Sequence, residues 1–314
     1  MRWRWICFWI EFKDTYGKAE KMSTPMNAQC YLCHLKRNTE TARAMAGEEA
    51  ATKVAKGLMQ AYLEAPEHVG SPWFGPTVES LLREHCGLVG DRFQEEKEES
   101  NRFVMERLPQ IRQRITDAAD PVYAGLQMAV LGNYIDFSAL KGQVSFETLE
   151  QMLTQAETIS LDLDCYARLC RDLDTAESLL YITDNAGEIG FDRLCAEAIH
   201  ARYPNVRITF CVRGGPASND ATRIDAAAVG APFPVIDNGS CLAGTQPELL
   251  GEEAKQAMET ADVILSKGQA NVETLMGCGK NIYYVFLIKC IRFQELFGKE
   301  KLTPMLIAER TETE

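Results

Sequence analysis

Residues 178–192 read SLLYITDNAGEIGFD, so an apolar run is followed at once by a cluster of oxygen-bearing side chains. The first five residues predict a buried β-strand, and residues 187–205 predict the helix that follows it. The alternation of short apolar runs with helical stretches continues, and further strands are expected at residues 206–214, 233–239, 262–268 and 281–288. Thr245 and Glu248 have the spacing of a capping box for the third helix, and a tail helix should follow the last strand. Strands separated by such helices pair in parallel through right-handed crossovers, which predicts a doubly wound, mainly parallel, Rossmann-like α/β sheet.

The first half of the chain has a helical pattern instead. A long helix is expected to stop at Pro66, and Asp120 with Pro121 has the form of a helix N-cap followed by proline in the first turn. We therefore expect an all-helical cap domain over residues 23–170 and an α/β domain that binds metal and phosphate over residues 171–314.

Composition and charge exclude several classes of protein. The 314 residues carry a net charge of −12 and a pI near 5.0, which argues against nucleic acid as a partner because phosphate backbones need a basic face. No apolar run approaches the roughly 18–20 residues that span a bilayer, so no membrane partner is expected. The 11 cysteines are scattered without a disulfide spacing, which is typical of a reduced, cytoplasmic protein. We expect residues 1–22 to be a non-native or disordered extension, with Met22 or Met26 as the true start.

Oxygen donors follow two of the predicted strands. Asp184 and Asn185 come directly after the first strand, and Asp220 lies in the loop after the second. In an open parallel sheet, ligands bind beyond the carboxyl ends of the strands, where these residues should meet. Carboxylate and amide oxygens without adjacent His or Cys suit Mg²⁺ or Mn²⁺ better than Zn²⁺. The structural alternative is that Asp184 and Asp220 each cap the helix that follows.

Positive charges and glycine gather at the same predicted edge. The fourth strand ends in Lys267 and Gly268, Asn271 follows shortly after, and the fifth strand leads to Lys289. A lysine beside exposed backbone N–H groups can hold a phosphate, and glycine permits a close approach of the backbone. The GxxxxGK[ST] and GxGxxG patterns are both absent from the sequence, so nucleotide binding of those kinds is not expected.

Further candidates have weaker signals. Glu188 or Asp192 could orient an attacking water, although each could equally be an acid that interacts with a helix dipole. Asn133 and Asp136, in GNYID at the end of an apolar helix, could reach the substrate or could simply terminate that helix.

Cys30 and Cys33 form a CxxC next to His34 and are a candidate second metal or redox pair. The alternative is a pair of buried thiols on a packed helix, since a zinc site needs about four ligands and no second CxxC exists.

Together, the stretches CYLC, GNYIDF, DNAGEIGFD, ND-AT, ILSKGQANVETL and FLIKC resemble the damage-control phosphatase family, in the family's order and over residues 26–307. The leading CxxC resembles the stand-alone, mostly prokaryotic branch. The resemblance implies metal-dependent hydrolysis of small phosphate esters, including sugar phosphates and damaged metabolites, with Mn²⁺, Co²⁺, Ni²⁺ or Mg²⁺. It also implies metal ligation by Asp184, Asn185 and Asp220, and phosphate contacts from Lys289 and the Lys267 loop. The stretch RGGPASND departs from the family, which tends to be more apolar before Asn-Asp.

Three functions therefore remain open at the level of sequence. The first is a metal-dependent phosphoric monoester hydrolase with a small phosphorylated metabolite as its partner. The second is an S-adenosylmethionine-dependent carboxyl methyltransferase, whose ligand would also lie at strand ends and whose activity has been claimed for a relative. The third is a non-enzymatic metal- or redox-sensing module that uses the CxxC.

Overall fold

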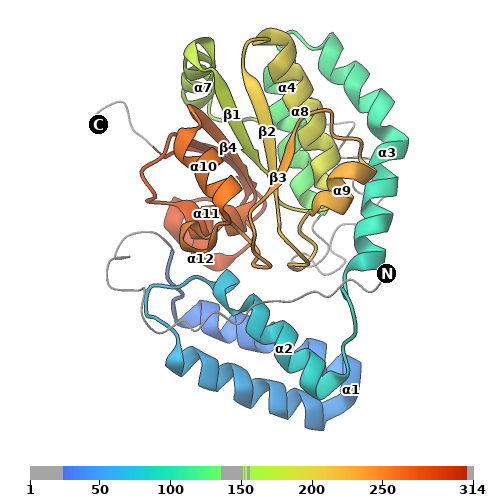
Figure 1. The fold of residues 1–314 in the computed structure, drawn as a ribbon, viewed down its shortest axis with the longest axis vertical. Coiled ribbons are helices and arrows are strands. Elements are labelled where there is room, and N and C mark those ends of the chain that lie inside the picture. The colour runs from blue at the N-terminus through green and yellow to red at the C-terminus, as the bar shows by residue number, and fades with distance from the viewer. Residues whose placement is uncertain (1–23, 136–150, 152, 154–155, 310–314) are drawn as a thin grey trace.

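A six-stranded sheet forms the centre of the computed structural model, which describes residues 24–135, 151, 153 and 156–309 (Figure 1). The strand order is β3-β2-β1-β4-β5-β6, with all neighbours parallel except β5 and β6. The strands are β1 (Ser178–Ile182), β2 (Arg207–Val212), β3 (Val235–Asp237), β4 (Val263–Lys267), β5 (Ile282–Leu287) and β6 (Pro304–Ala308). The predicted doubly wound, mainly parallel sheet is confirmed. The expectation for residues 1–22 lies outside the described residues.

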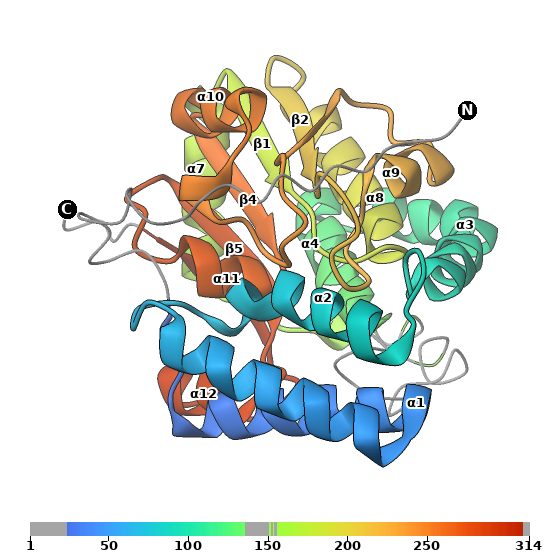
Figure 2. The same ribbon diagram turned by 60° about the horizontal axis from the view of Figure 1, so that its bottom comes forward.

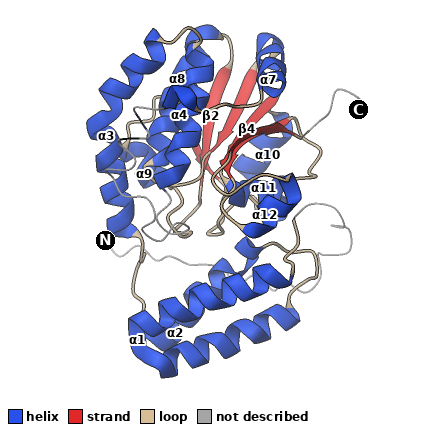
Figure 3. Cartoon of the chain, turned by 180° about the vertical axis from the view of Figure 1, so that it is seen from behind, coloured by secondary structure: helices blue, strands red, loops and turns tan. Residues whose placement is uncertain are grey.

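Helices cover both faces of the sheet. Successive side chains of a strand point to opposite faces, and apolar side chains on both faces are buried. In β5, Tyr283 and Val285 pack in the core of one face, whereas Tyr284 and Phe286 pack in the core of the other. The first face carries α4 (Pro121–Gly132), α7 (Leu163–Thr175) and α8 (Glu188–Arg202); the second carries α10 (Glu252–Thr260), α11 (Gln269–Leu275) and α12 (Ile291–Phe297). Figure 3 shows the strands enclosed between these layers.

Two more helices extend the first layer. The helix α3 (Gln94–Asp117) packs outside α4 and α8, and α9 (Arg223–Ala228) packs beside α8.

No described helix combines the length and apolar character needed to cross a bilayer.

The helices α1 (Ala28–Glu64) and α2 (Gly75–Cys86) form a separate small core at the carboxyl end of the sheet (Figure 2). The backbone of α1 breaks at Gly47, where φ is 83°, and its two ends lie side by side, with the rings of Tyr31 and Tyr62 5.1 Å apart. The helices of residues 23–170 therefore fall into two groups. The pair α1 and α2 stands apart, whereas α3, α4 and α7 belong to the layers on the sheet.

A short chain of contacts joins the α1–α2 pair to the sheet. On α11, Glu273 accepts hydrogen bonds from Ser71 Oγ (3.0 Å) and Gln269 Nε2 (3.0 Å), and its carbonyl accepts from Thr24 N (2.9 Å). The side-chain oxygen of Gln269 in turn accepts from Lys289 N (3.0 Å). Two side chains therefore connect the segment before α2 to the residues that follow β5.

Local predictions had mixed outcomes. The Asp120 cap is confirmed, since its carboxylate accepts from Val122 N and Tyr123 N. The capping box at Thr245 is wrong, because α10 begins only at Glu252 with Gly251 as its N-cap. The tail helix exists as α12, but it ends at Gly298 in the left-handed region and leads into the unpredicted strand β6.

Candidate metal and phosphate site

The site residues lie where the sheet reverses its winding. From the neighbours β1 and β4, the strand order runs to β2 and β3 on one side and to β5 and β6 on the other. Such a switch point leaves a crevice at the carboxyl ends of the two central strands, where ligands bind. Asp184 follows β1, and Gly268 follows β4 directly.

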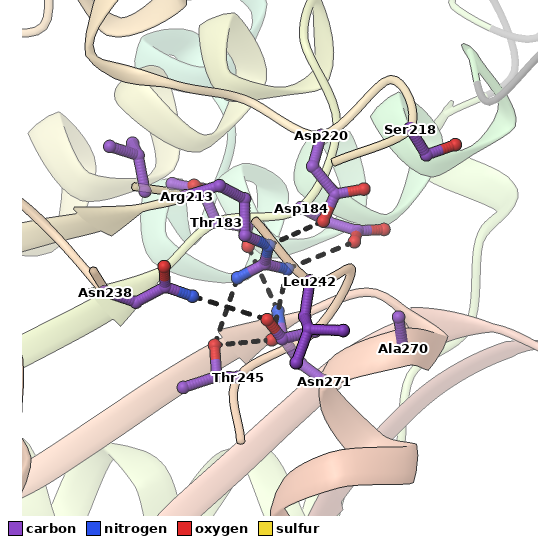
Figure 4. Close-up of polar contacts among 12 residues, drawn as sticks. Thr183, Asp184, Arg213, Ser218, Asp220, Asn238, Leu242, Thr245, Ala270 and Asn271 are labelled. Carbon is purple, nitrogen blue, oxygen red and sulfur yellow. Dashed lines mark hydrogen bonds and ion pairs between the residues drawn. The ribbon is translucent and has the colours of Figure 1, made fainter. Parts of the chain in front are cut away.

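The structure brings Asp184 and Asp220 together. Their loops are joined by a β-bridge between Asn185 and Asp220 and by a hydrogen bond from Ala221 N to the Asp184 carbonyl (2.7 Å). Both carboxylates contact one guanidinium: Arg213 Nε lies 2.6 Å from Asp220 Oδ2, and its Nη2 lies 3.8 Å from Asp184 Oδ1. Figure 4 shows the two acids side by side at this arginine. Neither acid caps a helix, since α8 has Gly187 as its N-cap and α9 has Thr222.

Gly268 is required by the position of Asp184. A Cβ atom at residue 268 would lie 1.9 Å from Asp184 Oδ2, far inside any van der Waals contact. The backbone of Gly268 also has φ 80° and ψ 158°, a region that only glycine enters readily. Its N–H donates to Val285 O (3.0 Å), so this residue contributes space and not a donor to the site.

The side-chain amides of Asn133 and Asn185 hold the carboxylates of Asp184 and Glu188 in place. The Nδ2 atoms of Asn133 and Asn185 each donate to Asp184 Oδ2 (3.1 and 2.9 Å) and to Glu188 Oε2 (2.8 and 2.9 Å). The other end of the Asn133 amide accepts from Leu287 N (3.2 Å). Because Asn185 uses its nitrogen on two carboxylates, its carbonyl oxygen is directed away from them and is available as a ligand.

Lys267 is buried behind Glu188, so it does not face an open position where a phosphate could bind. Its side chain is 0% exposed, and Nζ donates to Glu188 Oε1 (2.6 Å), Asp192 Oδ1 (2.7 Å) and Ala129 O (2.8 Å). An ammonium has three N–H groups, and all three are used here. Burial alone would lower the pKa of Lys267, but Asp192 and Glu188 together raise it above its ordinary value. Burial raises the pKa of Asp192 to about 7, with Lys267 opposing the shift.

Asn271 also supports the site instead of facing a ligand. Its Nδ2 donates to Thr183 O (3.0 Å) and Lys267 O (2.6 Å). Its Oδ1 accepts from Thr245 Oγ1 (2.9 Å) and Arg213 Nη2 (3.2 Å). The amide is therefore saturated by protein groups, and it locks the loops after β1, β2, β3 and β4 to one another.

Lys289 is half-buried, whereas Lys267 and Arg213 are fully buried. Burial raises the pKa of Asp184 well above its ordinary value, and Asp220 and Glu188 raise it further, while Lys289 and Arg213 oppose the shift. The positive charge of Lys289 therefore favours the ionised form of Asp184.

The remaining predicted residues lie elsewhere. Asp136 is outside the described residues. Cys30 is half-buried and Cys33 exposed in the first turns of α1, both as free thiols. Across the described part of the chain, no three or more His, Cys, Asp or Glu side chains are grouped so that they could hold a metal, so nothing here supports a CxxC metal site.

The donor set at the strand ends fits a hard divalent cation. It offers two carboxylates and one amide oxygen, all of them hard ligands. If every group is ionised, the site holds four negative and three positive charges: Asp184, Asp220, Glu188 and Asp192 against Arg213, Lys267 and Lys289. Buried like charges at this density favour an added cation.

Arg213 and Thr245 are site residues that the sequence reasoning missed. Arg213 directly follows β2, so the rule that singled out the other strand ends applies to it as well. Thr245 lies in the long loop between β3 and α10 and carries no comparable signal.

Comparisons with known proteins agree on one family. The family model for the damage-control phosphatase ARMT1-like domain matches residues 26–303. An uncharacterised protein of Methanocaldococcus jannaschii is 29% identical over 288 residues, which cover 88% of this chain and 93% of that protein. A damage-control phosphatase of Archaeoglobus fulgidus is 30% identical over 210 residues, 64% of this chain and 70% of the relative. A crystal structure of a DUF89 family protein from Pyrococcus horikoshii superposes with a TM-score of 0.78 at 26% identity, covering 91% of this chain and 100% of that one.

Proposed function

Because this chain belongs to the damage-control phosphatase ARMT1-like domain family, we propose that it is a metal-dependent phosphoric monoester hydrolase acting on small phosphate esters. The observation that carries the proposal is the meeting of Asp184 and Asp220 at the switch point, with Asn185 between them. The metal would be held by these three residues and would be Mn²⁺, Co²⁺, Ni²⁺ or Mg²⁺, all of which accept oxygen ligands. Sugar phosphates and damaged phosphometabolites are the proposed substrates.

The charge of the site supports a phosphate dianion as the ligand. The ionised site has one more negative than positive charge, so a divalent cation would leave it with one net positive charge. That sign is complementary to a phosphate monoester, which carries about two negative charges near neutral pH. When bound, the cation would supply Lewis acidity to a phosphoryl oxygen and to the attacking water.

The chain's own residues would position the reactants. We propose that Lys289, half-buried and close enough to influence Asp184, contacts the phosphate and offsets charge on its oxygens. Glu188 is the proposed group for orienting the water, since its Oε2 shares both amide donors with Asp184. Lys267 and Asn271 would act one step behind, by holding Glu188 and the four loops in place.

Specificity among phosphate esters is assigned to α1 and α2, which lie at the carboxyl end of the sheet, and to the segment after Asn133 that includes Asp136. Asn133 itself is fully buried and bonded to Asp184 and Glu188, so its proposed contribution is to the acids and not to the substrate.

A phosphatase assay with matched variants tests the proposal. The purified protein should hydrolyse an aryl phosphate with Mn²⁺ or Co²⁺, lose that activity in EDTA, and recover it when metal is restored. Asp184→Asn should abolish hydrolysis. The control Asp237→Asn should not, because Asp237 ends β3 but pairs with the exposed Arg223 outside the site.

The result also separates the alternatives. Full metal-dependent activity in Asp184→Asn would overturn the assignment of the metal site. Tight binding of S-adenosylmethionine without metal would instead support a methyltransferase. Inactivity on every ester tested, together with stoichiometric thiol-bound zinc, would support a sensing module.

A further inference from the structure

Arg213 is the central contact of the candidate site, although no comparison assigns it a role. Its side chain is 0% exposed, and its guanidinium reaches four partners, three of them in different loops and one in α11. Nε donates to Asp220 Oδ2 (2.6 Å), Nη1 to Thr245 Oγ1 (3.0 Å) and Nη2 to Asn271 Oδ1 (3.2 Å), while Nη2 also lies 3.8 Å from Asp184 Oδ1 (Figure 4). A planar guanidinium can make several such contacts at once, which a lysine ammonium at the same position cannot reproduce.

The two acids at Arg213 would be unfavourable neighbours without it. Asp184 and Asp220 are both buried, and like charges that share a site oppose each other's ionisation. Removing one partner of a buried ion pair is strongly destabilising, because it leaves an uncompensated charge. Arg213 therefore supplies, in the metal-free protein, the positive charge that a divalent cation would otherwise supply.

Arg213 also limits how a cation can bind. Its Nε donates to Asp220 Oδ2 and so uses one of the lone-pair positions of that carboxylate, which leaves fewer of them for a metal. Its positive charge must also repel any cation that shares the two carboxylates. Both effects reduce the affinity of the site for a cation.

From these contacts we infer that Arg213 is a resident counter-ion of the metal site. It is a positioning residue that holds the carboxylates of Asp184 and Asp220 together before the cation binds, and it weakens cation binding so that the metal remains exchangeable. The inference deepens the proposed function and rests on it for the presence and identity of the cation.

Variants of Arg213 give the test, with Mn²⁺ as the probe. In Arg213→Gln, thermal stability in EDTA should fall, and the rise in Tm on adding Mn²⁺ should exceed that of the unmodified protein. A neighbouring charge changes the proton affinity of a carboxylate by roughly 10- to 1,000-fold, and Mn²⁺ affinity by calorimetry should tighten in the same sense by about tenfold. Arg213→Lys, which keeps the charge but loses the fork, should show a smaller change in both quantities.

The control is an arginine that pairs with a carboxylate away from the site. Arg112 donates from Nε and Nη2 to Glu197 (2.9 and 3.0 Å) between α3 and α8. Arg112→Gln should leave the affinity for Mn²⁺ and the Mn²⁺-dependent rise in Tm unchanged.

The double variant Arg213→Gln/Asp220→Asn separates charge from packing, and it is measured in EDTA. If Arg213 acts as a counter-ion, removing the Asp220 charge should restore most of the stability that Arg213→Gln loses. Weaker Mn²⁺ binding in a folded Arg213→Gln, or no recovery in the double variant, would overturn the inference. If the unmodified protein binds no divalent cation, the proposed function fails, whereas the comparison in EDTA still decides the counter-ion role.

Discussion

Replacing Gly268 by alanine tests whether the carboxylate of Asp184 must occupy its present position. A Cβ atom at residue 268 would lie 1.9 Å from Asp184 Oδ2 and 2.1 Å from its Cγ, whereas ordinary contact begins at 3.4 Å. The carboxylate or its loop must therefore move by about 1.5 Å, the difference between these distances. Since a misplacement of about 1 Å can lower an enzymatic rate about 100-fold, we expect Gly268→Ala to lose at least about 100-fold in hydrolysis.

Backbone strain has to be separated from this contact. The conformation of Gly268 costs a residue with a Cβ atom roughly 1–3 kcal/mol, which would lower stability without any effect on chemistry. Gly298→Ala is the matched control, because Gly298 also has a positive φ of 62° but a Cβ atom there meets nothing within 4 Å. Gly268→Ala should lose more stability than Gly298→Ala, because the overlap with Asp184 adds to the backbone strain, and only Gly268→Ala should lose activity.

Three measurements decide the outcome. Urea unfolding gives the stability of each variant, calorimetry gives the affinity for Mn²⁺, and the initial rate on an aryl phosphate gives the activity. If Gly268→Ala binds Mn²⁺ and hydrolyses the ester at the rate of Gly298→Ala, then the position of Asp184 is not critical and the reasoning is refuted.

Three further changes test other parts of the molecule. Lys267→Met leaves Glu188 and Asp192 buried without their counter-charge, so unfolding in urea should show a loss of about 3–5 kcal/mol; a loss below about 1 kcal/mol would contradict the buried network. Dialysis against EDTA followed by Mn²⁺ at about 100 times its Kd should raise the free energy of unfolding by about 2.7 kcal/mol, and Asp184→Asn should abolish this response. Burial lowers the pKa of His34 to about 3, so the unfolded chain takes up a proton below about pH 6.5 while the folded one does not. Protonation of His34 in the unfolded chain should therefore lower the free energy of unfolding by about 2 kcal/mol as the pH falls from 8 to 5. His34→Gln should lack this loss, and identical pH profiles for the two proteins would contradict the prediction.

The convergence of Asp184, Asn185 and Asp220 could be predicted because parallel strands carry their carboxyl ends to one edge. That argument needs only the strand boundaries, which short apolar runs mark clearly. It places residues at an edge, but it does not say to which face of the sheet a side chain turns.

Lys267 is a residue whose contacts depend on the face of the sheet to which its side chain turns. It lies two and four residues after Leu265 and Val263, which face α8, so the alternation of a strand turns Lys267 toward that helix as well. There it meets Glu188 and Asp192, which the sequence separates from it by about eighty residues. Its partners could be identified only once α8 was placed on that face.

Other differences have local causes. Thr245 and Glu248 have capping-box spacing, but the hydroxyl of Thr245 is used by Arg213 and Asn271, so the helix starts later. The strand β6 was missed because α12 is short, although Gly298 at its end is a recognisable stop signal.

The contacts of Glu273 have a consequence for how relatives of this protein can diverge. Ser71 and Thr24 hold Glu273, and Gln269 links Glu273 to the backbone of Lys289, so a change in how α1 and α2 sit can reach Lys289 through these hydrogen bonds. Asp184 and Asp220 are held by a different set of bonds, centred on Arg213. Under the proposed function, changes in the first third of the chain would alter which esters are admitted, whereas the residues proposed to hold the cation would keep their contacts.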